Sequence, residues 1–138
     1  MQTFLPYADY DQSAKVLDRQ RLGKQRVETL QLLKALAGQT KGWRTHPAAL
    51  MWRGYERQLA LYGLSMCAEW VKRGYQDTCA DKISALADLF TGSGKPDWLG
   101  ERAFHASHRS NLLRKDHKYY SQFDWSEPDD LPYVWPVS

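Results

Sequence analysis

A stripe of polar and mostly basic side chains lies along one face of the helix predicted near the N-terminus. Arg21, Lys24, Gln25 and Glu28 are separated by three, four and seven residues, which places them on one side of an α-helix. Lys24 and Glu28 can form an (i, i+4) ion pair, which adds only a few tenths of a kcal/mol on an exposed helix. That pair does not account for five basic residues between positions 15 and 26, because like charges this close repel one another. A phosphate backbone would relieve the repulsion, so the stripe predicts an anion-binding surface.

Basic residues gather in three segments of the chain. Residues 15–34 carry six basic and two acidic side chains, residues 41–57 four and one, and residues 101–118 five and two. The last fifteen residues carry four acidic side chains, and the whole chain is only +3. This segregation predicts one positive face, whose commonest ligand on a small intracellular domain is nucleic acid. The plainer interpretation is three ordinary solvated helix faces.

Four helices are expected to carry these residues. Asp11 or Ser13 caps the first helix, which Gly38 ends, and Pro47 lies in the first turn of the second. The third and fourth are indicated by apolar residues at helical spacing. The expected helices span about 11–37, 45–71, 77–90 and 101–116.

The fold class is predicted to be all-α, in one compact domain that spans residues 1–138. A chain of 138 residues with 43% hydrophobic content can bury one core. No segment shows the strict alternation of a strand, and no repeat of 20–50 residues is visible. Beyond residue 116 the chain is rich in proline and aromatic residues, which predicts an irregular segment packed down by its rings.

Several classes of protein and site are excluded by composition. No apolar run is long enough for a transmembrane helix, and the N-terminus does not resemble a signal peptide, so we expect a cytoplasmic, nucleoid-associated protein. Cys67 and Cys79 lack metal-ligand spacing, and we expect both to be reduced. His105 and His108 are three residues apart, but no glutamate or cysteine completes a metal site.

Residues 17–28, LDRQRLGKQRVE, resemble the first helix of the phage-type pyrimidine-dimer DNA glycosylase/AP lyase family, also called endonuclease V. In that family a Leu-x-x-Gln-His-Leu run sits seven residues before a catalytic glutamate. Here Gln20-Arg21-Leu22 occupies the run, and Glu28 stands seven residues beyond Arg21. The segments KGWRTHP at 41–47 and HAS at 105–107, with the basic and aromatic residues that follow to 120, are also similar. The family's histidine is Arg21 here and the arginine before its glutamate is Val27, so the resemblance leaves the substrate base open.

The resemblance implies covalent chemistry at an amine. A bifunctional glycosylase attacks the sugar C1′ with an unprotonated amine to form a Schiff base, and a neighbouring carboxylate moves protons. The family uses its N-terminal amine, and an α-amine has a reference pKa of about 8, against about 10.4 for a lysine. Because Gln2 is too large for removal of the initiator methionine, we expect Met1 to be the nucleophile and Glu28 to handle protons. Lys24, one turn before Glu28, is the rival nucleophile, and Glu28 as a simple ion-pair partner is the plainer alternative.

The same resemblance and the charge pattern together predict the residues that contact DNA phosphates, because basic side chains along a helix can follow a backbone. Tyr119, Tyr120, Phe123 and Trp125 are expected mostly to cap the core, with stacking on an extruded base as the alternative. The predicted DNA contacts are Arg19, Gln20, Arg21, Lys24, Gln25, Arg44, His46, His105, His108, Arg109, Arg114, Lys115 and Lys118.

These observations favour a monomeric DNA glycosylase with associated AP lyase activity. Its partner would be double-stranded DNA that carries a damaged or modified base, which we expect to be a pyrimidine. A pyrimidine dimer, an oxidised base and a modified cytosine all stay open. No cofactor, metal or membrane is expected, since an iminium intermediate is its own electron sink. The alternatives are a non-catalytic helical DNA-binding module and a protein-interaction domain whose charge is incidental.

Overall fold

Seven α-helices follow one another in the computed structural model, which describes residues 1–92 and 94–137. Within these ranges there is no strand, so the predicted all-α fold is confirmed, although four helices were expected. A short 3₁₀ helix, η1, spans Ser121–Phe123. The helices are α1 (Tyr10–Val16), α2 (Arg19–Leu36), α3 (Pro47–Leu50), α4 (Glu56–Lys72), α5 (Ala80–Ala87), α6 (Arg102–Lys115) and α7 (His117–Tyr120).

The prediction of a single first helix is wrong, because the helix is interrupted between α1 and α2. Leu17 is fully buried in an extended conformation with ψ of 138°. Asp18 then caps α2, since its carboxylate accepts the backbone N–H of Arg21. The cap of α1 is Asp9, two residues before the earlier of the two predicted caps. The break turns α2 away from α1 and lets α2 start at the basic stripe.

The second predicted helix is also divided, into α3 and α4. Pro47 opens α3 as predicted, and the His46 side chain caps it. Gly54 adopts φ of 90° in the turn that separates α3 from α4, a conformation that side chains with a Cβ rarely take. The chain therefore re-enters a helix only at Glu56.

The fourth predicted helix is confirmed as α6, and the third is shorter than expected as α5. The chain after η1 has no helix or strand to residue 137, in agreement with the predicted irregular segment. Tyr120 is fully buried and stacks on Trp125 with ring centroids 5.6 Å apart. These rings cap the core, as expected for most of the aromatic group.

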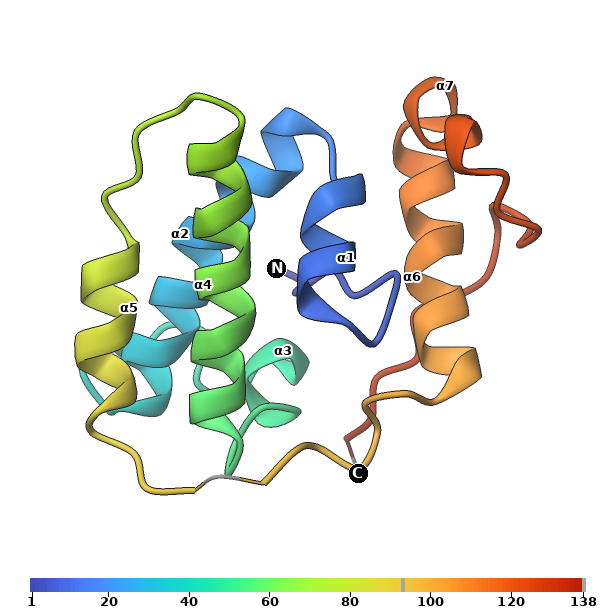
Figure 1. The fold of residues 1–138 in the computed structure, drawn as a ribbon. Coiled ribbons are helices and arrows are strands. Elements are labelled where there is room, and N and C mark those ends of the chain that lie inside the picture. The colour runs from blue at the N-terminus through green and yellow to red at the C-terminus, as the bar shows by residue number, and fades with distance from the viewer. Residues whose placement is uncertain (93, 138) are drawn as a thin grey trace.

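Helices α2 and α4 pack closely against each other. A Cβ on Gly63 of α4 would lie 2.4 Å from the methyl carbon of Thr29 of α2, so only glycine permits this crossing. The N-terminal residues run between these two helices and α6, on the side away from α5 (Figure 1). Thr3 and Leu5 are fully buried there, and Trp52 donates to the Thr3 hydroxyl at 3.0 Å. The first residues of the chain are thus part of the core.

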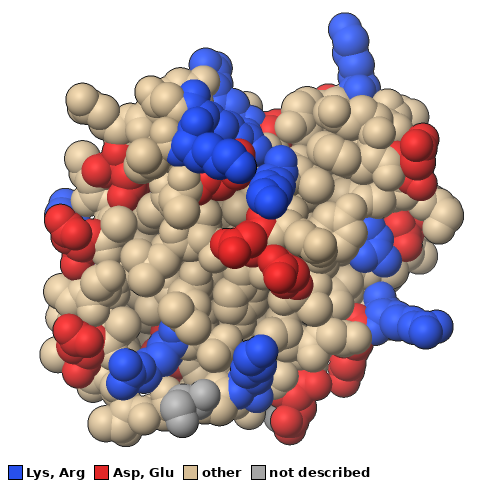
Figure 2. Space-filling view, in the orientation of Figure 1, with Lys and Arg blue, Asp and Glu red and all other residues tan. Residues whose placement is uncertain are grey.

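Basic and acidic side chains are interspersed on the face shown in Figure 2. The largest group of Lys and Arg on this face lies near the end of α4 and the junction of α1 with α2 (Figures 1 and 2). No helix within the described residues has the length and apolar character needed to cross a membrane.

Candidate active site

A pocket of about 280 Å³ opens where the N-terminal segment meets α2, the end of α6 and the C-terminal segment. Its position matches the stripe predicted on the first helix. Seven residues proposed from the sequence are brought together here by elements that lie far apart in the chain. The pocket is lined by Met1, Gln2, Phe4, Gln20, Arg21, Lys24, Gln25, Glu28, Lys115 and Tyr133.

Glu28 is a half-buried carboxylate on the wall of this pocket. Burial raises its pKa above the ordinary value, because an apolar environment disfavours the charged form. The Gln2 backbone N–H, the N-terminal ammonium, the Lys24 ammonium and the Gln25 amide partly oppose that rise. An amine and a carboxylate with a raised pKa therefore share one pocket, an arrangement suited to nucleophilic attack combined with proton transfer.

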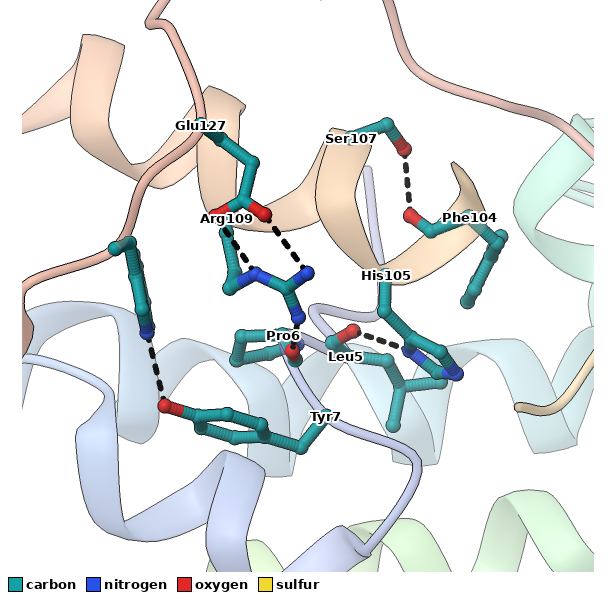
Figure 3. A network of polar contacts seen from close by, with 9 residues as sticks. Leu5, Pro6, Tyr7, Phe104, His105, Ser107, Arg109 and Glu127 are labelled. Carbon is teal, nitrogen blue, oxygen red and sulfur yellow. Dashed lines mark hydrogen bonds and ion pairs between the residues drawn. The ribbon is translucent and has the colours of Figure 1, made fainter. Parts of the chain in front are cut away.

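Two histidines of α6 hold the N-terminal segment by its backbone. The Leu5 N–H donates to Nδ1 of His108 at 2.8 Å, and Nδ1 of His105 lies 2.7 Å from the Leu5 carbonyl oxygen. Nε2 of His105 accepts the Gly100 N–H, so its proton resides on Nδ1 and is donated to Leu5, as drawn in Figure 3. Both backbone groups of Leu5 are thereby fixed, four residues from the N-terminal amine.

The predicted phosphate contacts of His105 and His108 are wrong. His108 is fully buried and His105 is 5% exposed, so neither ring can reach a DNA backbone. Burial lowers the pKa of His108 to about 3 and also lowers that of His105. Both rings are therefore neutral near pH 7, whereas a phosphate contact would favour a charged ring.

Arg109, another predicted DNA contact, is used within the fold. Its guanidinium donates twice to Glu127, at 2.9 Å each, and once to the Pro6 carbonyl oxygen at 2.6 Å (Figure 3). These bonds occupy all three of its nitrogen atoms. Arg109 thus ties the N-terminal and C-terminal segments to α6, and its predicted role at the DNA is corrected accordingly.

Gln25 was also expected to contact DNA, and it is only 1% exposed. Its side chain bonds to the N-terminal segment and to Glu28 instead. Arg21 is half-buried, with one nitrogen 3.2 Å from Asp18, and it still lines the pocket. His46 is half-buried too, and its Nδ1 accepts the Ala48 N–H at 3.0 Å.

The other predicted contacts keep exposed side chains, so their role at DNA stays a prediction. Three of them, Gln20, Lys24 and Lys115, line the pocket. Arg114 of this group is bonded to Asn111. The exposed residues are Arg19, Gln20, Lys24, Arg44, Arg114, Lys115 and Lys118.

Tyr133 lines the pocket and was not predicted from the sequence. It lies on the C-terminal segment, which buried side chains of α6 hold through its backbone: Ser110 accepts the Leu131 N–H and Asn111 donates to the Leu131 carbonyl, at 3.0 Å each. The Tyr133 ring packs edge-on against His108 at 5.6 Å. An aromatic residue in an irregular segment carries no spacing signal, so only the fold reveals this position.

No group of three or more His, Cys, Asp or Glu residues that could hold a metal ion occurs in the described part of the chain. A family model described as pyrimidine dimer DNA glycosylase matches residues 1–83. That range contains α1 to α4, most of the pocket wall and Glu28. No curated protein and no solved structure matches the chain.

Proposed function

Since this chain belongs to the pyrimidine dimer DNA glycosylase family, we propose that it removes a damaged or modified pyrimidine from double-stranded DNA and then cleaves the strand as an AP lyase. The observation that carries the proposal is the pocket that Met1 and Glu28 line together with exposed basic residues. An extruded nucleotide could enter such a pocket while the flanking phosphates contact Lys24 and Lys115.

The proposed reaction begins at the Met1 amine. Its lone pair attacks C1′ of the target nucleotide, the C1′–N glycosidic bond breaks, and the base leaves with the bonding electrons and takes a proton from the attacking nitrogen. The C1′–O4′ bond then opens, and protonated Glu28 gives its proton to O4′. The product is an iminium between the Met1 nitrogen and C1′.

Strand cleavage follows from the acidity of the iminium. The Glu28 carboxylate takes a proton from C2′, the electrons move into the C2′–C3′ bond, and the C3′–O bond breaks to release the phosphate. Glu28 ends protonated, as it began. A carboxyl with a raised pKa suits both steps, because it holds a proton at a pH closer to neutrality than an exposed glutamate does.

Borohydride trapping tests this proposal. The protein is incubated with a duplex that carries one abasic site, the iminium is reduced, and the adduct is mapped by mass spectrometry. We expect an adduct on the Met1 nitrogen that persists in Lys24→Ala. An adduct on Lys24 would assign the nucleophile to that residue, and salt-sensitive DNA binding without any adduct would favour a non-catalytic DNA-binding module.

Glu28→Gln separates binding from chemistry in the same assay. The neutral amide is close in shape to the carboxylic acid but cannot take a proton from C2′. We expect undamaged DNA to bind with unchanged affinity and strand cleavage at an abasic site to be abolished. Duplexes that carry a pyrimidine dimer, an oxidised pyrimidine or a modified cytosine then identify the base that the wild-type protein releases.

A further inference from the structure

Gln25 of α2 is a buried amide that joins the N-terminal segment to Glu28. Its Nε2 donates to the Gln2 carbonyl oxygen at 2.9 Å and to the Glu28 carboxylate at 3.2 Å. Its Oε1 accepts the Phe4 N–H at 3.0 Å and lies within hydrogen-bond distance of the Tyr62 hydroxyl. Every hydrogen and both lone pairs of this side chain thus face a partner.

The partners permit only one orientation of this amide. Rotating the group by 180° would place its oxygen against the Gln2 carbonyl and the Glu28 carboxylate, and its hydrogens against the Phe4 N–H. Donor would then face donor and acceptor would face acceptor at a site that is 1% exposed, where unmade hydrogen bonds are costly. The position of Nε2 between Gln2 and Glu28 is therefore fixed by the fold.

Tyr62 strengthens this constraint from α4. Burial raises its pKa well above the ordinary value, so the hydroxyl keeps its proton. That hydroxyl also lies 2.8 Å from the Phe4 carbonyl oxygen, and its single proton serves either this oxygen or Gln25. The backbone of the N-terminal segment is consequently hydrogen-bonded by α2 at residue 2, by α4 at residue 4 and by α6 at residue 5.

We propose that Gln25 is a positioning residue of this site: its amide holds the Gln2 carbonyl and the Glu28 carboxylate side by side, and so sets the distance between the Met1 amine and the carboxylate. The inference rests on the proposed function, because it assigns Gln25 to the reaction of that amine. It also replaces the DNA contact predicted for Gln25 from the sequence. Gln25 acts through its two partners and touches no reacting atom.

The Gln25→Glu variant removes only the donating half of the side chain. A carboxylate at this position still accepts from Phe4 and Tyr62, but it repels the Gln2 carbonyl and Glu28. The Gln25 hydrogen bond lowers the pKa of Glu28, so losing it and adding a like charge both raise that pKa. Gln39→Glu is the matched control, because it makes the same change at an exposed position just beyond the end of α2, away from Glu28.

The readouts are the trapping rate at an abasic site and the pH dependence of strand cleavage from the preformed Schiff base, both in single-turnover experiments at saturating protein. For Gln25→Glu we expect trapping on Met1 to fall roughly tenfold or more, as misplaced reacting groups do. The acidic limb of the cleavage profile should move to higher pH by roughly one unit. Gln39→Glu should match the wild-type protein in both readouts.

Outcomes separate this inference from the proposed function. If the wild-type protein traps no abasic site, the proposed function fails, and the assignment of Gln25 to that reaction fails with it. If the wild-type protein traps on Met1 but Gln25→Glu shows the wild-type profile, the proposed function stands and the positioning role is wrong. A loss of rate with an unmoved acidic limb would show a merely structural role and would also overturn the inference.

A measurement on the wild-type protein covers the case in which the variant does not fold. The side-chain amide resonances of Gln25 are followed by NMR from pH 4 to pH 8. We expect both hydrogens to shift with a single midpoint, since both depend on the ionisation of Glu28. Amide resonances that do not respond to that ionisation would overturn the proposal.

Discussion

Mild acid should destabilise this protein through His108. The ring is fully buried, and burial lowers its pKa from 6.5 to about 3. Between these values the unfolded chain binds a proton at this position and the folded chain does not. A group with a lowered folded pKa of this kind makes stability rise with pH, and the stability is lost as the pH falls below 6.5.

The size of the effect follows from the unfolded chain alone. At pH 5 the folded ring is still neutral, and the pH lies about 1.5 units below the unfolded pKa of 6.5. Each unit lowers the free energy of unfolding by about 1.4 kcal/mol, so the total loss is about 2 kcal/mol. His105 contributes in the same direction, because its pKa is lowered as well.

The assay is urea denaturation at pH 7 and pH 5, followed by far-ultraviolet circular dichroism. His108→Asn offers an amide oxygen that can still accept the Leu5 N–H, but it does not titrate. The smaller side chain leaves a cavity and lowers stability at both pH values, so the informative quantity is the change between them. We expect the wild-type protein to lose about 2 kcal/mol more than His108→Asn. Equal losses in the two proteins would refute the reasoning.

Two further predictions concern Glu28 and the crossing of α2 with α4. Because burial raises the pKa of Glu28, the folded state holds the carboxyl proton more tightly than the unfolded state does, and ionisation of Glu28 lowers stability as the pH rises above the unfolded pKa. Glu28→Gln should therefore melt at a higher temperature than the wild-type protein at pH 7, with no such gain at pH 4. A gain in melting temperature of equal size at both pH values would contradict this. Gly63→Ala should cost about 1–3 kcal/mol in urea denaturation, because its Cβ would meet the Thr29 methyl at 2.4 Å. The control Gly42→Ala meets no atom within 4 Å and should stay near the wild-type value, and Thr29→Ser should recover part of the loss in Gly63→Ala.

The all-α class and the basic stripe could be predicted because both depend on local spacing. Residues three and four apart share a helix face wherever the helix begins, so Arg21, Lys24 and Glu28 line one pocket although the predicted helix start was wrong. The break at Leu17 and Asp18 was missed because apolar periodicity continues through it. Aspartate is a favourable residue for a helix cap, but the Asp18 carboxylate also accepts a hydrogen bond from the Tyr120 hydroxyl. This tertiary contact cannot be seen in the local sequence.

The interior role of α6 could not be read from its sequence. His108, Ser110 and Asn111 are all fully buried, whereas residues of these types are usually exposed or intermediate. Their burial depends on partners that are distant in the chain, namely the backbone of Leu5 and of Leu131. A sequence pattern shows the polarity of a residue but not the partner that satisfies it. The basic and polar residues of α6 were therefore assigned to DNA when several of them bind the protein's own backbone.

Those misassigned residues also support the proposed role of the chain terminus as a reactive group. Terminal residues are usually poorly ordered unless other elements tie them down, and an amine that moves freely cannot hold a reacting geometry. Here Gln25, Tyr62, His105 and His108 bond the backbone of residues 2 to 5 from three helices. The atoms that make these bonds are buried, so displacing the segment would leave several of them unsatisfied at once. His105 and His108, which we expect to make the fold sensitive to acid, thus also help to keep the first residues of the chain beside Glu28.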